Sequence, residues 1–180
     1  DVDRFRPPSI AERAEIRRSL GIEAGVTAIG FIGRIDPKKG IEQLLEAHAL
    51  LRARAIRPTV LVVTGQATRH LGGANAPYLA ELRERTGPEV LWLGHRSDPD
   101  QVLRALDLLV VPSQWPEPFG LVAAEAMASG VPVIAADRGG LPEVLGTQFA
   151  AQIVEPDPAG LADAIERVLS QDGLLTRLGE

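Results

Sequence analysis

The feature that most constrains the fold of this chain is a regular alternation of short apolar runs with longer segments of helical spacing. The runs are rich in Val, Ile and Leu and show little polar alternation, as strands covered on both faces do. They span residues 28–32, 59–64, 90–93, 108–111, 131–135 and 151–154. Six strands that alternate with helices pair in parallel through right-handed crossovers. The sequence therefore predicts an α/β fold, a doubly wound domain with a six-stranded parallel sheet.

Apolar residues at helical spacing occupy the segments between these runs, and one further helix is expected at the start. The stripes begin at Ile41, Tyr78, Val102, Val122 and Leu161. The earlier helix is expected over residues 9–20, because Ser9 and Glu12 have the spacing of a capping box and Gly21 can end the helix.

Other polar residues and the longest loop are expected to have structural roles. His48 lies on an apolar helix face, which favours a core or rim histidine over a ligand. Asp98 is expected to cap a helix and Asp107 to lie at a helix end. The segment 65–77 is expected to be the longest loop.

Composition excludes several functional classes. Of the 180 residues, 45% are apolar but only 4% are aromatic, so aliphatic side chains must fill the core. The net charge of −5 argues against a nucleic-acid partner, because binding the phosphate backbone requires a basic face. The absence of cysteine excludes disulfides, thiolate metal sites and a cysteine nucleophile. No apolar run approaches the roughly 18 residues of a membrane span.

Ligands of doubly wound sheets bind at the carboxyl ends of the strands, so the loops after the strands are informative. The first such loop is Gly33-Arg34-Ile35-Asp36-Pro37-Lys38-Lys39-Gly40. Arg34, Lys38 and Lys39 crowd the start of a helix, where the helix dipole favours acidic residues. A bound phosphate would resolve this conflict, since backbone N–H groups and cations both bind it. The alternative is a solvated turn with ordinary surface cations.

The second informative loop runs from Trp115 to Gly130 and carries two carboxylates, Glu117 and Glu125. A carboxylate can accept two hydroxyls of a ribose or hexose, as acidic residues do in dinucleotide-binding folds. Phe119 and Gly120 fall where the next helix begins, and Gly120 would let a ligand approach the backbone. The alternative for Glu125 is a helical residue that complements the dipole, and Glu117 could be structural.

These loops together resemble the donor-site signature of retaining GT-B glycosyltransferases, in the group 1 family that includes sucrose synthases and mannosyltransferases. The resemblance rests on Gly33-Arg34, Lys39-Gly40, Glu117-Pro118-Phe119-Gly120 and Glu125-Ala126, in order and with family spacing. Residues 139–143 resemble the next loop of the family, and residues 2–5 the start of its C-terminal domain. The resemblance implies that the sheet is the Rossmann-like C-terminal half of a GT-B fold.

The resemblance also implies site residues. Arg34, Lys39 and Glu117 are the expected catalytic residues; Arg34 and Lys39 would neutralise the donor diphosphate, and Glu117 would accept sugar hydroxyls. Glu125 would accept the ribose hydroxyls. The full set expected to bind the donor is Gly33, Arg34, Lys39, His95, Arg96, Glu117, Phe119, Gly120, Leu121 and Glu125. His95 and Arg96 would lie near the base, although both could equally be solvated loop residues.

No cofactor and no metal are expected, because fixed cations and a helix N-terminus would stabilise the leaving diphosphate. The expected partners are a UDP-, GDP- or ADP-sugar and an acceptor that is a sugar, a lipid or a small molecule. The start on Asp1 without a methionine suggests a piece of a longer protein. The resemblance implies that residues 1–180 form its donor domain, joined to an N-terminal acceptor domain. The expected location is the cytoplasm, with attachment to the inner membrane surface through the missing domain as an alternative.

Two other functions fit the same loops. A nucleotide-sugar 2-epimerase would share the architecture and differ in loop chemistry, and a degenerate domain would bind nucleotide sugars without catalysis. Retention of both glutamates and both cations argues against degeneracy. A nicotinamide-dependent oxidoreductase fits poorly, because no Gly-x-Gly-x-x-Gly follows the first strand.

Overall fold

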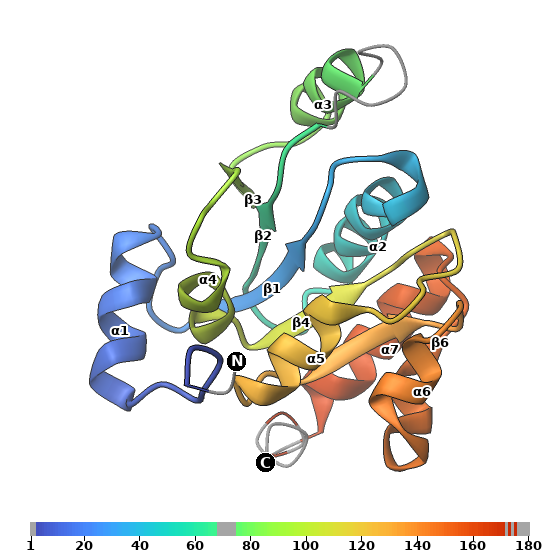
Figure 1. The fold of residues 1–180 in the computed structure, drawn as a ribbon. Coiled ribbons are helices and arrows are strands. Elements are labelled where there is room, and N and C mark those ends of the chain that lie inside the picture. The colour runs from blue at the N-terminus through green and yellow to red at the C-terminus, as the bar shows by residue number, and fades with distance from the viewer. Residues whose placement is uncertain (1–2, 68–74, 172, 174, 176–180) are drawn as a thin grey trace.

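The computed structural model describes residues 3–67, 75–171, 173 and 175, and its ribbon is shown in Figure 1. Its six strands form one sheet in the order β3-β2-β1-β4-β5-β6, and every neighbouring pair is parallel. The strands are β1 (Thr27–Ile32), β2 (Thr59–Thr64), β3 (Val90–Gly94), β4 (Leu108–Val111), β5 (Val133–Ala136) and β6 (Ile153–Val154). The six-stranded parallel sheet predicted from the sequence is thus confirmed.

Helices cover both faces of this sheet (Figure 1). α2, α3 and α7 pack on one face, and α1, α4, α5 and α6 pack on the other. The helices are α1 (Ile10–Ser19), α2 (Ile41–Ala53), α3 (Asn75–Glu84), α4 (Pro99–Ala105), α5 (Leu121–Ala128), α6 (Leu141–Leu145) and α7 (Pro158–Ser170). Two 3₁₀ segments are η1 (Pro37–Lys39) and η2 (Thr147–Gln152).

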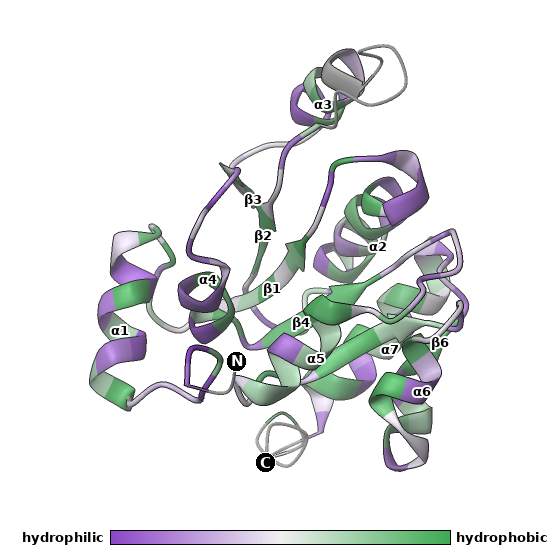
Figure 2. Ribbon diagram, viewed as in Figure 1, coloured by the Kyte–Doolittle hydropathy of each residue, from purple (hydrophilic) through white to green (hydrophobic). Residues whose placement is uncertain are grey.

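The central strand β1 shows why the apolar segments that form the strands lack alternating polar residues. Ile29 and Phe31 pack in the cluster under α2 and α7, whereas Ala28 packs on the opposite side with α4. At Gly30 an added Cβ would lie 2.0 Å from Leu106 Cδ1, so the helix layer touches the strand backbone there. In Figure 2 the central strand β4 is green, whereas helices such as α1 and α2 carry both green and purple residues. Each fully buried aliphatic side chain contributes about 1.5–3 kcal/mol to folding.

The first helix is held by the polar contacts that the sequence predicted and by further ones. Ser9 Oγ accepts from the Glu12 backbone N–H at 3.2 Å, and a Glu12 carboxylate oxygen accepts from the Ser9 N–H at 3.3 Å, which completes the capping box. Asp107 then anchors the helix to the sheet. Its carboxylate pairs with Arg13 and Arg17 and also accepts from the Ala28 N–H at 2.8 Å.

The structure differs from the sequence prediction at β5. The strand begins at Val133, because the backbone N–H of Val131 donates to Ala126 O at 2.9 Å. Gly130, at φ +70°, donates to Met127 O, so the two residues form a Schellman cap on α5. Val131 is therefore buried as part of a helix cap instead of a strand.

Other differences concern short or irregular segments. β6 is two residues long, because η2 occupies the residues before it. α6 (Leu141–Leu145) begins inside the segment 139–143 that resembled a loop. α3 begins at Asn75, inside the segment 65–77 that was expected to be a loop, and residues 68–74 of that segment lie outside the described residues.

The strand order reverses between β1 and β4, which are neighbours in the sheet although they are far apart in the chain. Connections from β1 go towards β2 and β3, and those from β4 go towards β5 and β6. This is the topological switch point, outside which doubly wound sheets bind their ligands. The loops after β1 and β4 are the two that carry the expected site.

Candidate functional site

The loop after β1 turns Lys39 towards the switch point. Asp36 caps η1, since one of its carboxylate oxygens accepts from the Lys38 N–H at 2.9 Å. Gly40 then adopts φ +72°, and an added Cβ would lie 1.9 Å from Pro112 O, so this turn fits closely against the loop after β4. Arg34 lies on the same loop with its side chain exposed.

Gln114 ties the two loops together. Its backbone N–H donates to Lys38 O at 2.9 Å. Its side-chain amide donates to Pro112 O at 3.0 Å and to Pro156 O at 2.7 Å. The loop that carries Glu117 is thus fixed to the loop that carries Lys39.

Two donors meet on one oxygen of Glu117. Lys39 Nζ lies 2.5 Å from Glu117 Oε1, and Ser113 Oγ donates to the same oxygen at 2.6 Å. Burial would raise the pKa of Glu117, but the hydrogen bonds from Lys39 and Ser113 and the charges of Lys39 and Arg34 outweigh it, so the pKa lies below its ordinary value. Glu117 is therefore an ionised acceptor at neutral pH.

The backbone of Glu117 is held from the other side by the loop after β5. Gly140 N–H donates to Glu117 O at 2.7 Å, and Glu117 forms an isolated parallel bridge with Gly139. Gly139 has φ +60°, and an added Cβ would lie 2.2 Å from Glu117 O. Only glycine combines this backbone conformation with so close an approach.

A cleft of about 400 Å³ lies at the switch point. Its lining includes seven of the ten residues expected from the sequence, namely Gly33, Arg34, Lys39, Glu117, Phe119, Gly120 and Leu121. Phe119 and Leu121 are 54% and 68% exposed. α5 begins at this cleft without a side-chain cap, so its first N–H groups can meet an anion.

Gly120 is required for a reason that the sequence did not indicate. It has φ +83°, and an added Cβ would lie 2.5 Å from Leu141 Cδ2. The missing side chain therefore makes room for the packing of α6 against the start of α5. The close contact at Gly120 is therefore with Leu141 of the protein itself.

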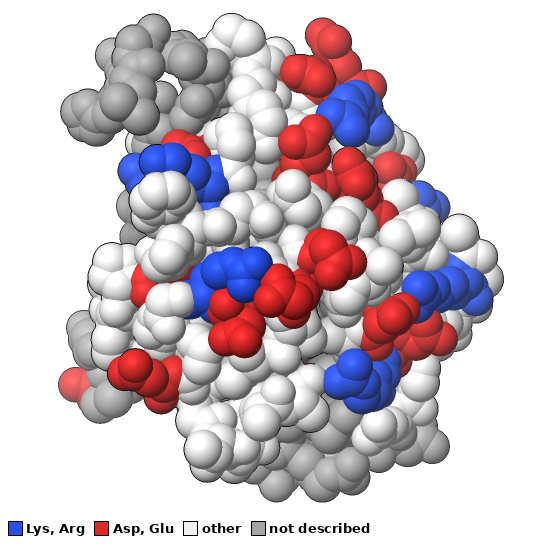
Figure 3. All heavy atoms as spheres, turned by 90° about the vertical axis from the view of Figure 1, so that its right-hand side faces the viewer, with Lys and Arg blue, Asp and Glu red and all other residues white. Residues whose placement is uncertain are grey.

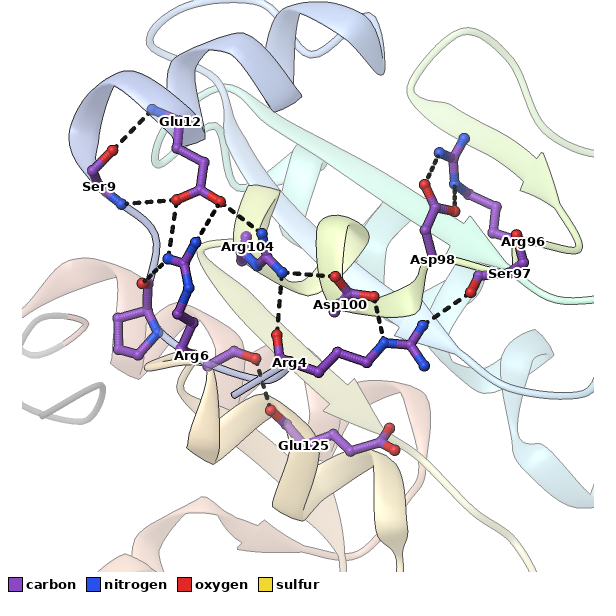
Figure 4. A network of polar contacts seen from close by, with 12 residues as sticks. Arg4, Arg6, Ser9, Glu12, Arg96, Ser97, Asp98, Asp100, Arg104 and Glu125 are labelled. Carbon is purple, nitrogen blue, oxygen red and sulfur yellow. Dashed lines mark hydrogen bonds and ion pairs between the residues drawn. The ribbon is translucent and has the colours of Figure 1, made fainter. Parts of the chain in front are cut away.

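Glu125 is not part of the cleft lining. It lies on α5, where burial raises its pKa and the charge of Arg4 partly opposes the rise. Figure 4 shows Glu125 beside Arg4, whose guanidinium donates to Asp100 at 2.8 Å and to Ser97 O at 2.9 Å. The second carboxylate therefore lies beside the N-terminal segment, whose Arg4 in turn contacts the loop after β3.

His95 and Arg96, on the loop after β3, also lie outside the cleft lining. His95 is exposed. Arg96 forms two hydrogen bonds with Asp98, at 2.8 and 2.6 Å (Figure 4). Asp98 occupies the N-cap position of α4, as expected, but its carboxylate makes no cap hydrogen bond there.

The sequence reasoning missed Ser113 and Gln114. Both follow β4 within three residues of its end, so their place at the ligand-binding edge could have been inferred. By contrast, His48 is the expected core histidine: it is 2% exposed, and its Nε2 lies 3.0 Å from Thr59 Oγ1. Burial, reinforced by the charge of Arg52, lowers the pKa of His48 to about 4, so the ring is neutral at pH 7.

Charges of both signs are interspersed on the face shown in Figure 3. Within the described ranges, no group of three or more His, Cys, Asp or Glu residues could hold a metal ion. No described helix combines the length and apolar character needed to cross a bilayer.

The strand order and the cleft at its switch point define a doubly wound, Rossmann-like α/β domain. The chain belongs to the glycosyl transferases group 1 family, whose model matches residues 12–180. It is similar to a D-inositol 3-phosphate glycosyltransferase of Corynebacterium jeikeium, with 38% identity over 100% of this chain and 44% of the relative. It is also 33% identical to the lipopolysaccharide core biosynthesis mannosyltransferase LpsB of Rhizobium meliloti, over 87% of this chain and 44% of that protein.

Solved structures show the same fold. Anabaena Alr3699/HepE in complex with UDP and glucose has a TM-score of 0.87 and 27% identity, and the match covers 100% of this chain and 48% of that one. The C-terminal domain of a group 1 family protein (LpcC) of Francisella tularensis has a TM-score of 0.84 and 28% identity, with 100% and 92% covered. The chain thus has the fold of the C-terminal half of a GT-B glycosyltransferase. It spans less than half the length of the two curated relatives named above.

Proposed function

We propose that this chain is the domain of a glycosyltransferase that binds the nucleotide-diphosphate sugar donor. The observation that carries the proposal is the convergence of Arg34, Lys39 and Glu117 at the switch point, beside the uncapped start of α5. Cations and helix N-termini both bind phosphate, and an ionised carboxylate accepts hydroxyls. The Anabaena relative was solved with UDP and glucose and with UDP-glucose, which makes a uridine nucleotide the first ligand to test.

In this proposal the diphosphate lies against the loop after β1 and the start of α5. Arg34 and Lys39 supply the charge, Gly33 leaves room beside them, and the N–H groups of residues 119–121 bind the phosphate oxygens. Because charge develops on the leaving diphosphate, groups fixed in advance stabilise the transition state without a metal ion. These residues would thus support the chemistry as well as the binding.

The sugar, ribose and base of the donor would contact the two carboxylates and the loop after β3. Glu117 accepts a hydroxyl of the sugar and Glu125 those of the ribose. The base lies near His95 and Arg96. Since Asp98 already holds the Arg96 guanidinium, the base would be bound mainly by the backbone of this loop.

The full-length protein would transfer a hexosyl group to an acceptor hydroxyl with retained configuration. The match covers only 44% of each curated relative named above, which supports a preceding domain that binds the acceptor. The acceptor would be a sugar, a lipid or a small molecule.

Calorimetry of the chain with UDP, GDP, ADP and their hexose derivatives tests the donor site. We expect one nucleoside diphosphate to bind, and Arg34→Ala to weaken it by about 1–3 kcal/mol, the scale of a charge-assisted contact. Arg57→Ala is the matched control, because this exposed arginine precedes β2 and lies at the amino-terminal ends of the strands, away from the cleft. No binding by any of these nucleotides, or equal losses in both variants, would refute the proposal.

A further inference from the structure

The carboxylate of Glu117 is asymmetric in its contacts. Oε1 accepts from Lys39 Nζ at 2.5 Å and from Ser113 Oγ at 2.6 Å. In the part of the chain that the structure describes, no donor forms a hydrogen bond with Oε2. An ionised carboxylate has about two lone-pair sites on each oxygen, so Oε1 is saturated and Oε2 has both sites open.

Ser113 is placed so that it acts on Glu117 and not on a ligand. The residue is 1% exposed and lies two positions after β4, behind the carboxylate that lines the cleft. Its hydroxyl hydrogen is committed to Oε1. Ser113 is not among the residues that line the cleft. Any effect of Ser113 on a bound sugar must therefore pass through Glu117.

The backbone of Glu117 is fixed independently of the side chain. Gly140 N–H holds Glu117 O at 2.7 Å, and the close approach of Gly139 prevents the peptide from shifting. With the backbone held on one side and Oε1 on the other, the remaining freedom is rotation of the carboxylate plane. Lys39 alone could follow such a rotation, because its ammonium carries three donors on a flexible stem. The short, buried Ser113 cannot, so it fixes the plane.

We propose that Ser113 is a positioning residue for donor-sugar recognition, which holds Oε1 of Glu117 so that Oε2 alone accepts a sugar hydroxyl. The inference rests on the proposed function, since it presumes that a nucleotide sugar occupies the cleft. It also narrows the expectation that Glu117 accepts sugar hydroxyls, because it assigns this role to Oε2. Recognition then depends on Oε2, within whose reach the sugar must present a hydroxyl hydrogen.

The test compares the nucleotide sugar with its diphosphate in one variant. Calorimetry gives the ratio of the dissociation constants of UDP and UDP-glucose, or of whichever pair from the nucleotide panel binds the wild type. We expect Ser113→Ala to lower this ratio about tenfold, the scale of a hydrogen bond to a charged group, and to leave the diphosphate affinity unchanged. The unchanged diphosphate affinity shows that the variant is folded.

Ser129→Ala is the matched control. Ser129 is also 1% exposed, and its hydroxyl donates to a backbone carbonyl, that of Glu125, at 2.9 Å. The Ser129→Ala variant loses an equally buried hydroxyl that does not contact the Glu117 carboxylate. Its ratio of the dissociation constants of UDP and UDP-glucose should therefore equal that of the wild type. Equal ratios in all three proteins, or equal losses for UDP and UDP-glucose in Ser113→Ala, would overturn the positioning role alone. Failure of the wild type to bind any nucleotide would overturn the proposed function as well.

A second measurement needs no ligand. The side-chain carboxyl resonance of Glu117, followed by NMR as the pH is varied, reports its pKa. Because the Ser113 hydrogen bond stabilises the ionised form, Ser113→Ala should raise the pKa of Glu117, and Ser129→Ala should not. An unchanged titration in Ser113→Ala would mean that the hydroxyl does not hold the carboxylate, and the inference would be wrong.

Discussion

Lys39 Nζ lies 2.5 Å from Glu117 Oε1, and the two residues belong to the loops that follow β1 and β4. The pair joins the cation expected to bind the diphosphate to the carboxylate expected to bind the sugar. It can form because β1 and β4 are neighbours in the sheet. An ammonium group has three N–H donors, so Lys39 can keep Glu117 and still reach a phosphate oxygen.

Lys39→Ala should weaken binding of the nucleoside diphosphate by about 1–3 kcal/mol, because it removes a charge-assisted contact. Binding of the nucleoside should hardly change. Lys38→Ala is the control, since Lys38 has the same charge on the same turn but packs over the Trp115 ring at 4.4 Å. Calorimetry that found equal losses for nucleoside and diphosphate would show that Lys39 does not bind phosphate.

Substitutions of Glu117 and Glu125 should weaken the binding of different ligands. If Glu125 binds the ribose, Glu125→Gln weakens the nucleoside diphosphate itself. If Glu117 binds the sugar, Glu117→Gln leaves the diphosphate affinity intact and lowers that of the nucleotide sugar. Both variants can be titrated with the same two ligands, and the opposite pattern would exchange the two roles.

The two carboxylates should also affect stability with opposite pH dependence. The pKa of Glu117 is lowered in the folded state, so its contribution is present above the ordinary carboxyl pKa and is lost as the pH falls through the lowered value. The pKa of Glu125 is raised mainly by burial, so its ionisation opposes folding as the pH rises. At pH 7 we expect Glu117→Gln to lower Tm and Glu125→Gln to raise it. Melting curves at lower pH should show both differences shrinking, and parallel pH profiles would contradict the assignment.

The contact of Gly139 with Glu117 predicts a local defect. Gly139→Ala places a Cβ 2.2 Å from Glu117 O at φ +60°, whereas Gly21→Ala, at φ +75°, meets nothing within 4 Å. The control should lose about 1–2 kcal/mol for the left-handed conformation alone. Gly139→Ala should lose about 1–3 kcal/mol more for the clash, and also the sugar-dependent part of donor binding. Equal denaturation midpoints for the two variants would show that the loop after β5 does not hold Glu117.

Strands could be predicted because burial on both faces requires a continuous apolar run. Long helices could be predicted because burial of one face requires apolar residues at helical spacing. β2 and β4 have the bounds expected from their Val- and Leu-rich runs. Val131 was misassigned because burial in a Schellman cap and burial in a strand both select an apolar residue. The five-residue α6 is too short to show helical spacing.

That Arg34, Lys39 and Glu117 share one cleft could be predicted, because the sequences of their loops are unusual. The partners of these residues could not, because they depend on contacts between loops. No spacing in the sequence indicates that Ser113 and Lys39 share one oxygen, or that Gly139 meets the Glu117 backbone. Those contacts follow from the strand order, which determines which loops are neighbours.

Residues 1–180 alone should bind donor without transferring sugar. The groups proposed to hold the diphosphate, ribose and sugar all lie within this chain, so binding should not need a further domain. Transfer requires an acceptor oriented against the anomeric carbon, and such positioning can lower the barrier by roughly 7–11 kcal/mol in favourable cases. It also requires exclusion of water, which an open cleft on one domain does not provide.

The assay incubates the chain with the donor that raises its Tm, together with candidate acceptors, and follows both transfer and hydrolysis. We expect at most slow hydrolysis, because water reaches the anomeric carbon while no acceptor is held there. A longer version that includes the proposed N-terminal acceptor domain is the control, since it should transfer with the same donor. Turnover by residues 1–180 near the rate of the longer protein would mean that this domain holds its own acceptor. The cleft beside Phe119 and Leu121, two exposed large apolar residues of its lining, would then be the first place to look for that acceptor site.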